Sequence, residues 1–399
     1  MNQTSQDISS WPTFVVVARA PAAVRFGINN PLDMHLRDYP TSLGPLEIDL
    51  RVRTPYVDEG YDPHVPRGVE FAVRGKAPSL EEAMSVLGNV GAFIAPVIAL
   101  GANAAVGDGV VWLAYDISPD VNRHPYYQLY MEPDRSLPSS KRRVDVEATV
   151  HLLRAIIGHP DSNLLNAAVG HYQVALNHLK PGQEILALAH LYMAADTLTN
   201  AAIRWLYIEN EVPHGDKTRL ARALGVKGDV LRDTARKLVI FEGDAECYKV
   251  VKEASDGFEH GFMPLDQIRS HALAMRDQTM THLRSAILTI ARLDDVVRAQ
   301  LMDRPFDFPY PDIGLVKYVK GAIVGKSDNL AADGYEYPLL QWQTTPQTTV
   351  TDTPGTYSIT FQDTIEPLFA PQLSFELHGH GAGGLTDRPV TDGHDRLGE

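Results

Sequence analysis

The stretch 182–208, GQEILALAHLYMAADTLTNAAIRWLYI, decides the fold of the middle of the chain. Between Glu184 and Arg204 its only formal charge is Asp196, and apolar residues fall on every side of a helical wheel. A helix that is apolar all round lies inside a protein or a membrane. Tyr, Asn, Thr and His side chains in its middle disfavour lipid. We therefore predict the central helix of a bundle, roughly 40 Å long at about 1.5 Å per residue.

The helical pattern extends on both sides of this stretch, from Val144 to about Arg298. Asp161-Ser162 can cap one of these helices, and glycines separate the later ones. In the last helix, apolar residues alternate in spacings of three and four along one seam. Its arginines lie off that seam: Arg269, Arg276, Arg284 and Arg292. Helices are predicted at 144–157, 162–179, 183–209, 216–224, 228–240, 244–257 and 265–294.

The first 138 residues predict an α+β domain with an antiparallel sheet. Strand-like segments recur with Pro and Asp clusters between them, and 46–52 alternates apolar and charged residues, as a half-buried strand does. Between the strands, 83–107 carries no charge over 25 residues, which is long enough to cross a bilayer. Its glycines and asparagines favour instead a buried helix of a soluble domain, begun by a capping box at Ser79 and broken near Pro96. The strands are predicted at 14–17, 46–52, 69–73, 110–115 and 126–130.

After the prolines of 305–311 the pattern becomes β-rich again. The strands expected there either pair among themselves or complete the N-terminal sheet; they are 315–320, 337–342, 348–350 and 357–361. From His378 the chain is Gly-rich and polar, and is expected to be disordered. The predicted organisation is therefore α+β: an N-terminal domain at 1–138, a helical bundle at 139–304 that begins with a basic linker at 138–143, a β-rich segment at 305–377 and a tail at 378–399.

Composition bounds the function. The net charge of −14 disfavours a large nucleic-acid surface, because phosphate contacts need clustered Lys and Arg. The single cysteine, Cys247, excludes an internal disulfide and any Cys-based zinc site, and fits a reducing, cytoplasmic location. Three histidines of the tail (His378, His380 and His394) lack the fixed geometry that a metal needs. No motif for a nucleotide, a nucleophile or a metal is found, so no cofactor is expected.

One block, about 166–293, resembles the HEPN (higher eukaryote and prokaryote nucleotide-binding) helical domains, especially their ApeA-like group. The resemblance rests on the segment MAADTLTNA (193–201), which looks like that group's acidic-Thr signature. It also rests on the pair His260-Gly261 at a helix end, and on the amphipathic helix that follows. These motifs are short and cover about a third of the chain.

Many HEPN proteins are metal-independent ribonucleases whose motif is an Arg followed after four to six residues by a His. The resemblance thus implies a catalytic role for His260, Lys252, Arg276 and His282, at the junction of the two helices 244–257 and 265–294. A His of near-neutral pKa and a cation suit proton transfer and neutralisation of a phosphorane. Before His260, however, no Arg stands in the expected window, and Arg276 with His282 matches the spacing only inside a helix.

Three functions remain open from the sequence. The first is an active HEPN ribonuclease with the N-terminal domain as sensor. The second is a catalytically silent HEPN-like module that acts as a ligand-binding or dimerisation scaffold. The third is a structural or assembly protein of a virus or particle. We expect a homodimer formed through the helical bundle and no membrane partner, and the acidic charge disfavours RNA.

Overall fold

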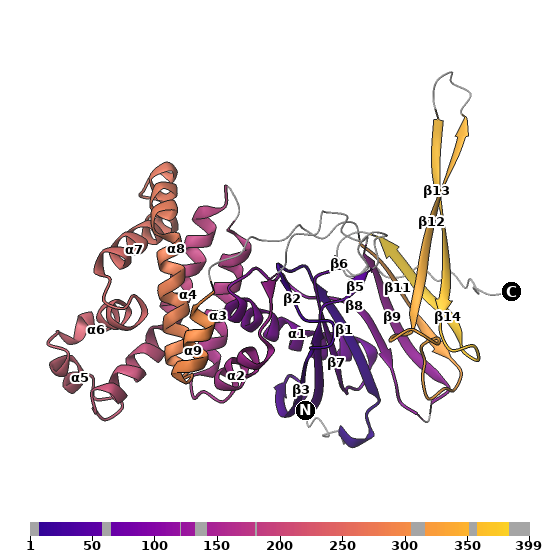
Figure 1. Cartoon of the computed structure of the whole chain (residues 1–399), viewed down its shortest axis with the longest axis horizontal. Helices are drawn as coiled ribbons and strands as arrows, with labels where there is room; N and C mark the ends of the chain where they lie inside the picture. The colour runs from indigo at the N-terminus through magenta and orange to yellow at the C-terminus, as the bar shows by residue number, and fades with distance from the viewer. Residues whose placement is uncertain are drawn as a thin grey trace, which may run out of the picture.

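An antiparallel sheet of eight strands lies beside a helical half in this α+β protein, as the sequence predicts (Figure 1). The computed structural model describes residues 8–57, 65–119, 121–131, 142–179, 182–304, 316–350 and 357–382. The sheet order is β14-β11-β9-β8-β1-β7-β4-β3. Its strands are β1 (Thr13–Ala20), β3 (Leu32–Thr41), β4 (Gly44–Arg53), β7 (Val69–Lys76), β8 (Val110–Asp116), β9 (Arg123–Met131), β11 (Val316–Val324) and β14 (Ser374–Ala382).

All five strands predicted in the N-terminal domain are present, whereas β3 was missed. Its apolar alternation is interrupted by an irregularity between Leu36 and Tyr39, where Asp38 adopts a left-handed φ of 51°. A bulge of this kind shifts the side-chain register and hides the period of two. Short strands and one turn complete this part: η1 (Ile8–Ser10), β2 (Val24–Arg25), β5 (Tyr56–Val57), β6 (Val65–Pro66) and β10 (Arg142–Arg143).

The sequence left open whether the C-terminal strands pair among themselves or complete the N-terminal sheet, and the structure shows both arrangements. Strands β11 and β14 complete the N-terminal sheet, while β12 (Leu339–Val350) pairs with β13 (Tyr357–Leu368) in a hairpin that projects beyond the sheet (Figure 1). Two expected strands, 337–342 and 348–350, are one. The expected tail is wrong at its start, because β14 runs through His378 to Ala382; residues 383–399 lie outside the described part.

The prediction of a basic linker at 138–143 is also partly wrong. Arg142 and Arg143 form β10, which pairs in parallel with β2, and Arg142 donates from Nη1 to the carbonyl of Ala102 at 2.9 Å. Positions 138–141 lie outside the described residues. Strand β10 thus joins the N-terminal domain to the helical half.

Helix α1 (Leu80–Ala102) lies between the sheet and the other helices, and it is the one described helix with the length and apolarity of a membrane span. Most of it is buried inside the protein, as expected for a soluble domain. The predicted break near Pro96 is wrong, because the helix continues through it. Proline removes the hydrogen bond to the carbonyl four residues earlier. That residue, Ala92, is exposed, so water can bond to its carbonyl instead.

The helical half, residues 146–302, agrees closely with the predicted helices. Helix α9 was not predicted as a separate helix. The side chain of Asp161 makes no capping hydrogen bond to α3 and pairs with Arg204 instead. The elements are α2 (Val146–Ile157), α3 (Ser162–Asn177), α4 (Glu184–Glu209), α5 (Lys217–Ala223), η2 (Gly228–Val230), α6 (Leu231–Ala235), the π-helical turn η3 (Arg236–Ile240), α7 (Ala245–His260), α8 (Leu265–Ile290) and α9 (Asp295–Met302).

Helix α4 is the central helix that the opening stretch predicts. It packs against α3, α6, α7 and α8, and its buried residues fall on several sides of the helix. Most of the predicted seam of α8 is buried, namely Ile268, Ala272, Thr279, Leu283, Ala286 and Ile290, whereas its first residue, Leu265, is exposed.

Arg284 of α8 is the exception to this seam, since its side chain is fully buried rather than placed on an outer face. It lies against the C-terminal end of α1. Its Nε donates to the carbonyl of Leu100 at 2.9 Å, and Nη2 donates to those of Gly101 at 3.0 Å and Leu301 at 2.6 Å. The last carbonyls of a helix have no partner within it. Arg284 supplies these partners and joins α8 to α1.

The outer face of the sheet, opposite α1, carries a second apolar core under the base of the β12–β13 hairpin. The buried side chain of Gln128 on β9 fixes this contact. Its Nε2 donates to the carbonyl of Leu340 at 2.9 Å, and its Oε1 accepts from the amide of Leu340 at 2.7 Å. A single side chain thus replaces one step of strand pairing.

We expect Arg284→Met to lower the free energy of unfolding by on the order of 3 kcal/mol, because several buried carbonyls lose a charged donor. Urea denaturation followed by circular dichroism measures this change. Arg276→Met, on the same helix and paired with its exposed neighbour Asp277, is the matched control and should cost less than about 0.5 kcal/mol. Equal costs for the two variants would contradict the role given to Arg284.

Candidate functional site

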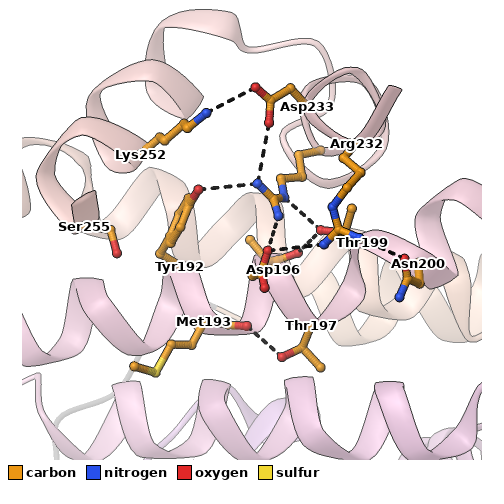
Figure 2. Close-up of polar contacts among 12 residues, drawn as sticks. Tyr192, Met193, Asp196, Thr197, Thr199, Asn200, Arg232, Asp233, Lys252 and Ser255 are labelled. Atoms are coloured by element: carbon orange, nitrogen blue, oxygen red, sulfur yellow. Dashed lines mark hydrogen bonds and ion pairs between the residues drawn. The ribbon is translucent and has the colours of Figure 1, made fainter. Parts of the chain in front are cut away.

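A buried arginine, Arg236, is the centre of the polar network in the helical half. Figure 2 shows four residues that contact it: Tyr192, Asp196, Thr199 and Asp233. Its Nε donates to Thr199 Oγ1 at 2.8 Å, and its Nη2 forms an ion pair with Asp196 of α4. Its Nη1 lies 3.5 Å from both Asp233 Oδ1 and the hydroxyl oxygen of Tyr192. Arg236 begins the π-helical turn η3, a conformation that is rare and frequent at functional sites.

Asp233 extends this network to α7. It accepts hydrogen bonds from the Tyr248 hydroxyl at 2.9 Å and from Lys252 Nζ at 3.1 Å. Burial alone would raise the pKa of Asp233, but these hydrogen bonds and the nearby cations outweigh it and hold that pKa below its ordinary value. The carboxylate is therefore charged at neutral pH, and it neutralises Lys252.

The segment MAADTLTNA gains a structural explanation from this network. Asp196 and Thr199 are three residues apart, so they lie on the same side of α4 and face Arg236 together. Asp196 also lies 3.7 Å from Arg232, and Asn200 accepts from Arg232 at 3.2 Å. This acidic segment thus holds the turn of residues 231–240 against the central helix.

His260 is the last residue of α7 and is exposed, and Gly261 follows it with a left-handed φ of 68°. This is the ordinary geometry of a helix C-terminus, where glycine adopts the left-handed conformation without strain. Arg276 forms an ion pair with its own neighbour Asp277 at 2.8 Å. Both residues thus have a local role on the surface of the bundle.

His282 is held by two carboxylates from the turn before α7. Its Nδ1 lies 3.1 Å from Glu242 Oε2, and its Nε2 lies 3.2 Å from Asp244 Oδ2. The buried thiol of Cys247 is close by. Among the residues that the structure describes, Asp244, Cys247 and His282 form the one group of His, Cys, Asp or Glu ligands close enough together to hold a metal ion.

The four predicted residues are therefore divided among separate contacts. Lys252 belongs to the Arg236 network, His282 to the Glu242–Asp244 turn, and Arg276 to Asp277. No hydrogen bond or ion pair in the described part of the chain joins any two of them. The shared catalytic role implied by the resemblance stays a prediction, and the cations among them already have acidic partners.

Three histidines, His171, His178 and His190, form a cluster that was not predicted. The first and the last are 19 residues apart, and the three come together only when α3 packs on α4. Nδ1 of His171 lies 3.3 Å from Nδ1 of His190, and the ring of His178 stacks on that of His190 with centroids 5.8 Å apart. Burial lowers the pKa of His171 and of His190 below the ordinary 6.5.

A cavity of about 560 Å³ on the outer face of the sheet was also missed. Strands β1, β3, β4, β7 and β8 form its floor, and Glu336 and Tyr337 close one side from more than 200 residues away in the sequence. Only the packing of the C-terminal segment on the sheet creates it. Its lining combines apolar, aromatic and charged residues: Val15, Met34, Leu50, Ala72, Tyr115, Tyr337, Asp33, His35, Asp49, Arg51, Arg74 and Glu336.

Beside this cavity a fully buried carboxylate, Glu70, bridges two arginines across three strands. Arg19 pairs with it at 2.9 Å and Arg53 at 2.8 Å. Arg19 also lies over the ring of Trp112, 3.5 Å from its centroid, and Arg53 forms an ion pair with Glu336. This row anchors the C-terminal wall of the cavity to the sheet.

Most charged groups that line the cavity have partners. Arg51 pairs with Asp33 at 3.2 Å and Glu336 at 3.8 Å, and His35 contacts Asp49 at 2.8 Å. Arg74 is exposed and has no ion pair with a described residue. It is therefore available to an anionic group that enters the cavity.

The chain has no significant match among protein-family models, curated proteins or solved structures.

The histidine cluster predicts a loss of stability on acidification. With a lowered pKa, the folded protein takes up protons at His171 and His190 less readily than the unfolded chain does. The stabilisation is thus complete above pH 6.5 and is lost as the pH falls below that value. Thermal unfolding from pH 8 to pH 5 should show a steeper decline for the parent than for the double variant His171→Gln/His190→Gln. Parallel curves would contradict this assignment.

Proposed function

We propose that the helical half is a catalytically silent HEPN-like module, and that the chain acts as a ligand-binding and dimerisation scaffold in the cytoplasm. One observation carries this proposal: the candidate cations are already neutralised within the fold. Lys252 pairs with Asp233, Arg276 with Asp277, and His282 lies between Glu242 and Asp244.

Cleavage of a phosphodiester needs cations aimed at the charge that develops on the phosphorane. A cation that is bound to a carboxylate of its own protein must lose that partner before it can serve a phosphate. For the buried Arg236 this would break contacts to Asp196, Asp233 and Thr199, and would leave carboxylates with reduced compensation. The network therefore supports a structural role.

Long-range electrostatics point the same way. The net charge of −14 repels a polyanion, and the carboxylates of Glu242, Asp244 and Asp233 lie beside the candidate residues themselves. RNA is accordingly a poor ligand for this surface.

The cavity on the outer face of the sheet supports the ligand-binding part of the proposal. Its volume of about 560 Å³ falls within the roughly 300–1,000 Å³ range typical of small-molecule sites. Tyr115 and Tyr337 offer aromatic surface, and Arg74 offers a cation. We infer a small ligand with an apolar or aromatic part and one anionic group.

Exposed apolar side chains support dimerisation through the bundle. Of the large apolar residues exposed in the described part of the chain, all but Ile28 and Tyr335 belong to the helical half. They include Phe262 and Leu265, which are 65% and 64% exposed at the turn between α7 and α8. Phe262 and Leu265 are only three residues apart, so they mark the part of this surface that we propose a second copy covers.

The β12–β13 hairpin favours a second candidate, the assembly protein. Its two strands pair over twelve residues each and project beyond the sheet (Figure 1). A projecting hairpin offers unpaired strand edges on which another chain can add. Assembly of this kind would give particles larger than a dimer.

The first test is RNA cleavage by the full chain in the presence of EDTA, with single-stranded RNA as substrate. We expect no cleavage above that of the buffer, because the candidate cations are neutralised. Light scattering on the same sample should give twice the 44.0 kDa chain mass, whereas larger particles would favour the assembly function. Cleavage that disappears in the folded double variant His260→Ala/His282→Ala would overturn the proposal in favour of the ribonuclease; cleavage that this variant retains reports a contaminating nuclease.

The second test uses 1-anilinonaphthalene-8-sulfonate, which joins an aromatic body to one anionic group, as a probe of the cavity. We expect saturable binding to the parent protein, and about tenfold weaker binding to Arg74→Gln, because a hydrogen bond to a charged group contributes roughly 1.5–3 kcal/mol. Arg37→Gln, an exposed arginine of β3 outside the cavity, is the matched control. Equal affinity for parent and Arg74→Gln would remove the cavity from the proposal.

A further inference from the structure

The turn between η3 and α7 brings three kinds of metal ligand to one point on α8. Asp244 and Cys247 come from the start of α7, and His282 comes from the facing side of α8. One ligand atom from each lies within 4.8 Å of those of the other two. Cys247 is buried, and the side chains of His282 and Asp244 are only 15% and 24% exposed. The group is thus largely shielded from water while one side stays open to it.

The two carboxylate contacts of His282 cannot both be satisfied by a neutral imidazole ring. Both of its nitrogens face carboxylate oxygens, at 3.1 Å for Glu242 and 3.2 Å for Asp244. A neutral imidazole has one N–H, so it can donate to one of these oxygens only. The other contact needs a positive charge, which either a second proton or a metal ion can supply.

The nearby thiol of Cys247 favours a metal ion over a second proton as the source of this positive charge. A doubly protonated His282 between two carboxylates has no need of a thiol, yet the Cys247 sulfur lies in the same group, with Thr279 Oγ1 as a neighbour at 3.5 Å. A set of one nitrogen, one sulfur and one carboxylate oxygen suits Zn²⁺, which is borderline soft. Magnesium and calcium prefer oxygen ligands alone.

We propose that this group is a Zn²⁺ site, with Asp244 Oδ2, Cys247 Sγ and His282 Nε2 as ligands. Two ligands about 2.0 Å from a tetrahedral zinc are roughly 3.3 Å apart, and Asp244 Oδ2 and His282 Nε2 are 3.2 Å apart. The fourth position takes water. A Zn²⁺ site here departs from the expectation, drawn from the single cysteine, that the chain has no Cys-based zinc site, because one thiolate is enough when a histidine and an aspartate complete the set.

Glu242 completes the arrangement from outside the metal. It lies at Nδ1 of His282, where it accepts the N–H and leaves Nε2 free to bind the ion. Carboxylates often fix the tautomer of zinc-bound histidine in this way. Glu242 adopts a left-handed φ of 51°, and Gly243 follows at 86°, so the turn brings both carboxylates to the same ring. Glu242 is therefore a positioning residue.

The start of α7 orients the other two ligands. Asp244 caps this helix, and its Oδ1 accepts the amide of Cys247 at 2.9 Å. Its Oδ2 faces His282 and also accepts a hydrogen bond from Gln278 Nε2, which holds the carboxylate in this orientation. Cys247 is three residues further on and lies on the same side of the helix. Zinc binds the thiolate form of cysteine, so zinc binding would release the Cys247 proton to solvent.

The zinc site is independent of the proposed scaffold function, because it is measured without RNA or a cavity ligand. Its consequence is mechanical: one ion would join the turn after η3, the first turn of α7 and the middle of α8. These are the elements that surround the predicted catalytic junction.

The test is metal binding by the full chain after removal of metal with a chelator. We expect one equivalent of Zn²⁺ by equilibrium dialysis and elemental analysis. With Co²⁺ as the probe, we expect a thiolate-to-cobalt charge-transfer band, which shows that Cys247 is a ligand. Zinc bound weakly by other histidines of the chain cannot give this band, since the chain has one cysteine.

Variants separate ligands from neighbours. Cys247→Ala should lose the band, and His282→Gln should weaken Zn²⁺ binding more than a hundredfold. Glu242→Gln should keep the band and weaken binding about 10- to 100-fold, the usual effect of removing a carboxylate behind a zinc-bound histidine. His260→Gln, at the exposed end of α7, is the control and should bind as the parent does. A parent protein without the band, or a folded His282→Gln variant that keeps the band with undiminished affinity, would overturn the site.

Discussion

The fold depends on hydrogen-bond donors for the buried carbonyls at the C-terminal end of α1. From Ile94 to Ala102 every residue of this helix is buried, so its last carbonyls cannot turn to water. Arg284 and Arg142 donate to them, and Asn103, in a left-handed conformation, ends the helix. Because Arg142 comes from β10, which pairs with β2 of the N-terminal domain, and Arg284 comes from α8, the same helix end joins that domain to the helical half.

Asn103 strengthens this junction with its own side chain. It accepts from the hydroxyl of Tyr172 on α3 at 2.8 Å and donates to the carbonyl of Arg304 at 2.9 Å. Buried polar groups of this kind are stabilising only when every member has a partner. The two halves of the protein are consequently specified together, through hydrogen bonds between residues 69 to 201 positions apart.

Carboxylates of the helical half pair mostly with other groups of the same protein. Asp196, Asp233 and Asp244 each accept from groups of other helices, and their partners include the cations that resemblance to HEPN ribonucleases would assign to catalysis. Arg236 is the buried member of this set, and removal of its partners would leave its charge uncompensated. Residues that look catalytic in the sequence can thus hold helices together in the protein.

The sequence by itself determined the α+β class, the five N-terminal strands, the apolar α1 and the helices 146–290, since each follows from the period of its own apolar residues. The sequence could not place Arg284. Its position off the apolar seam of α8 predicts exposure to solvent, and only the packing of α1 against α8 buries it. Nor could the sequence assemble His171 with His190, Glu336 with Arg53, or Cys247 with His282, because such pairs are set by how helices and strands pack. Local periodicity decides which elements form, whereas the partner of each buried charge is decided only by the tertiary structure, in which a lone charge is too costly to leave unpaired.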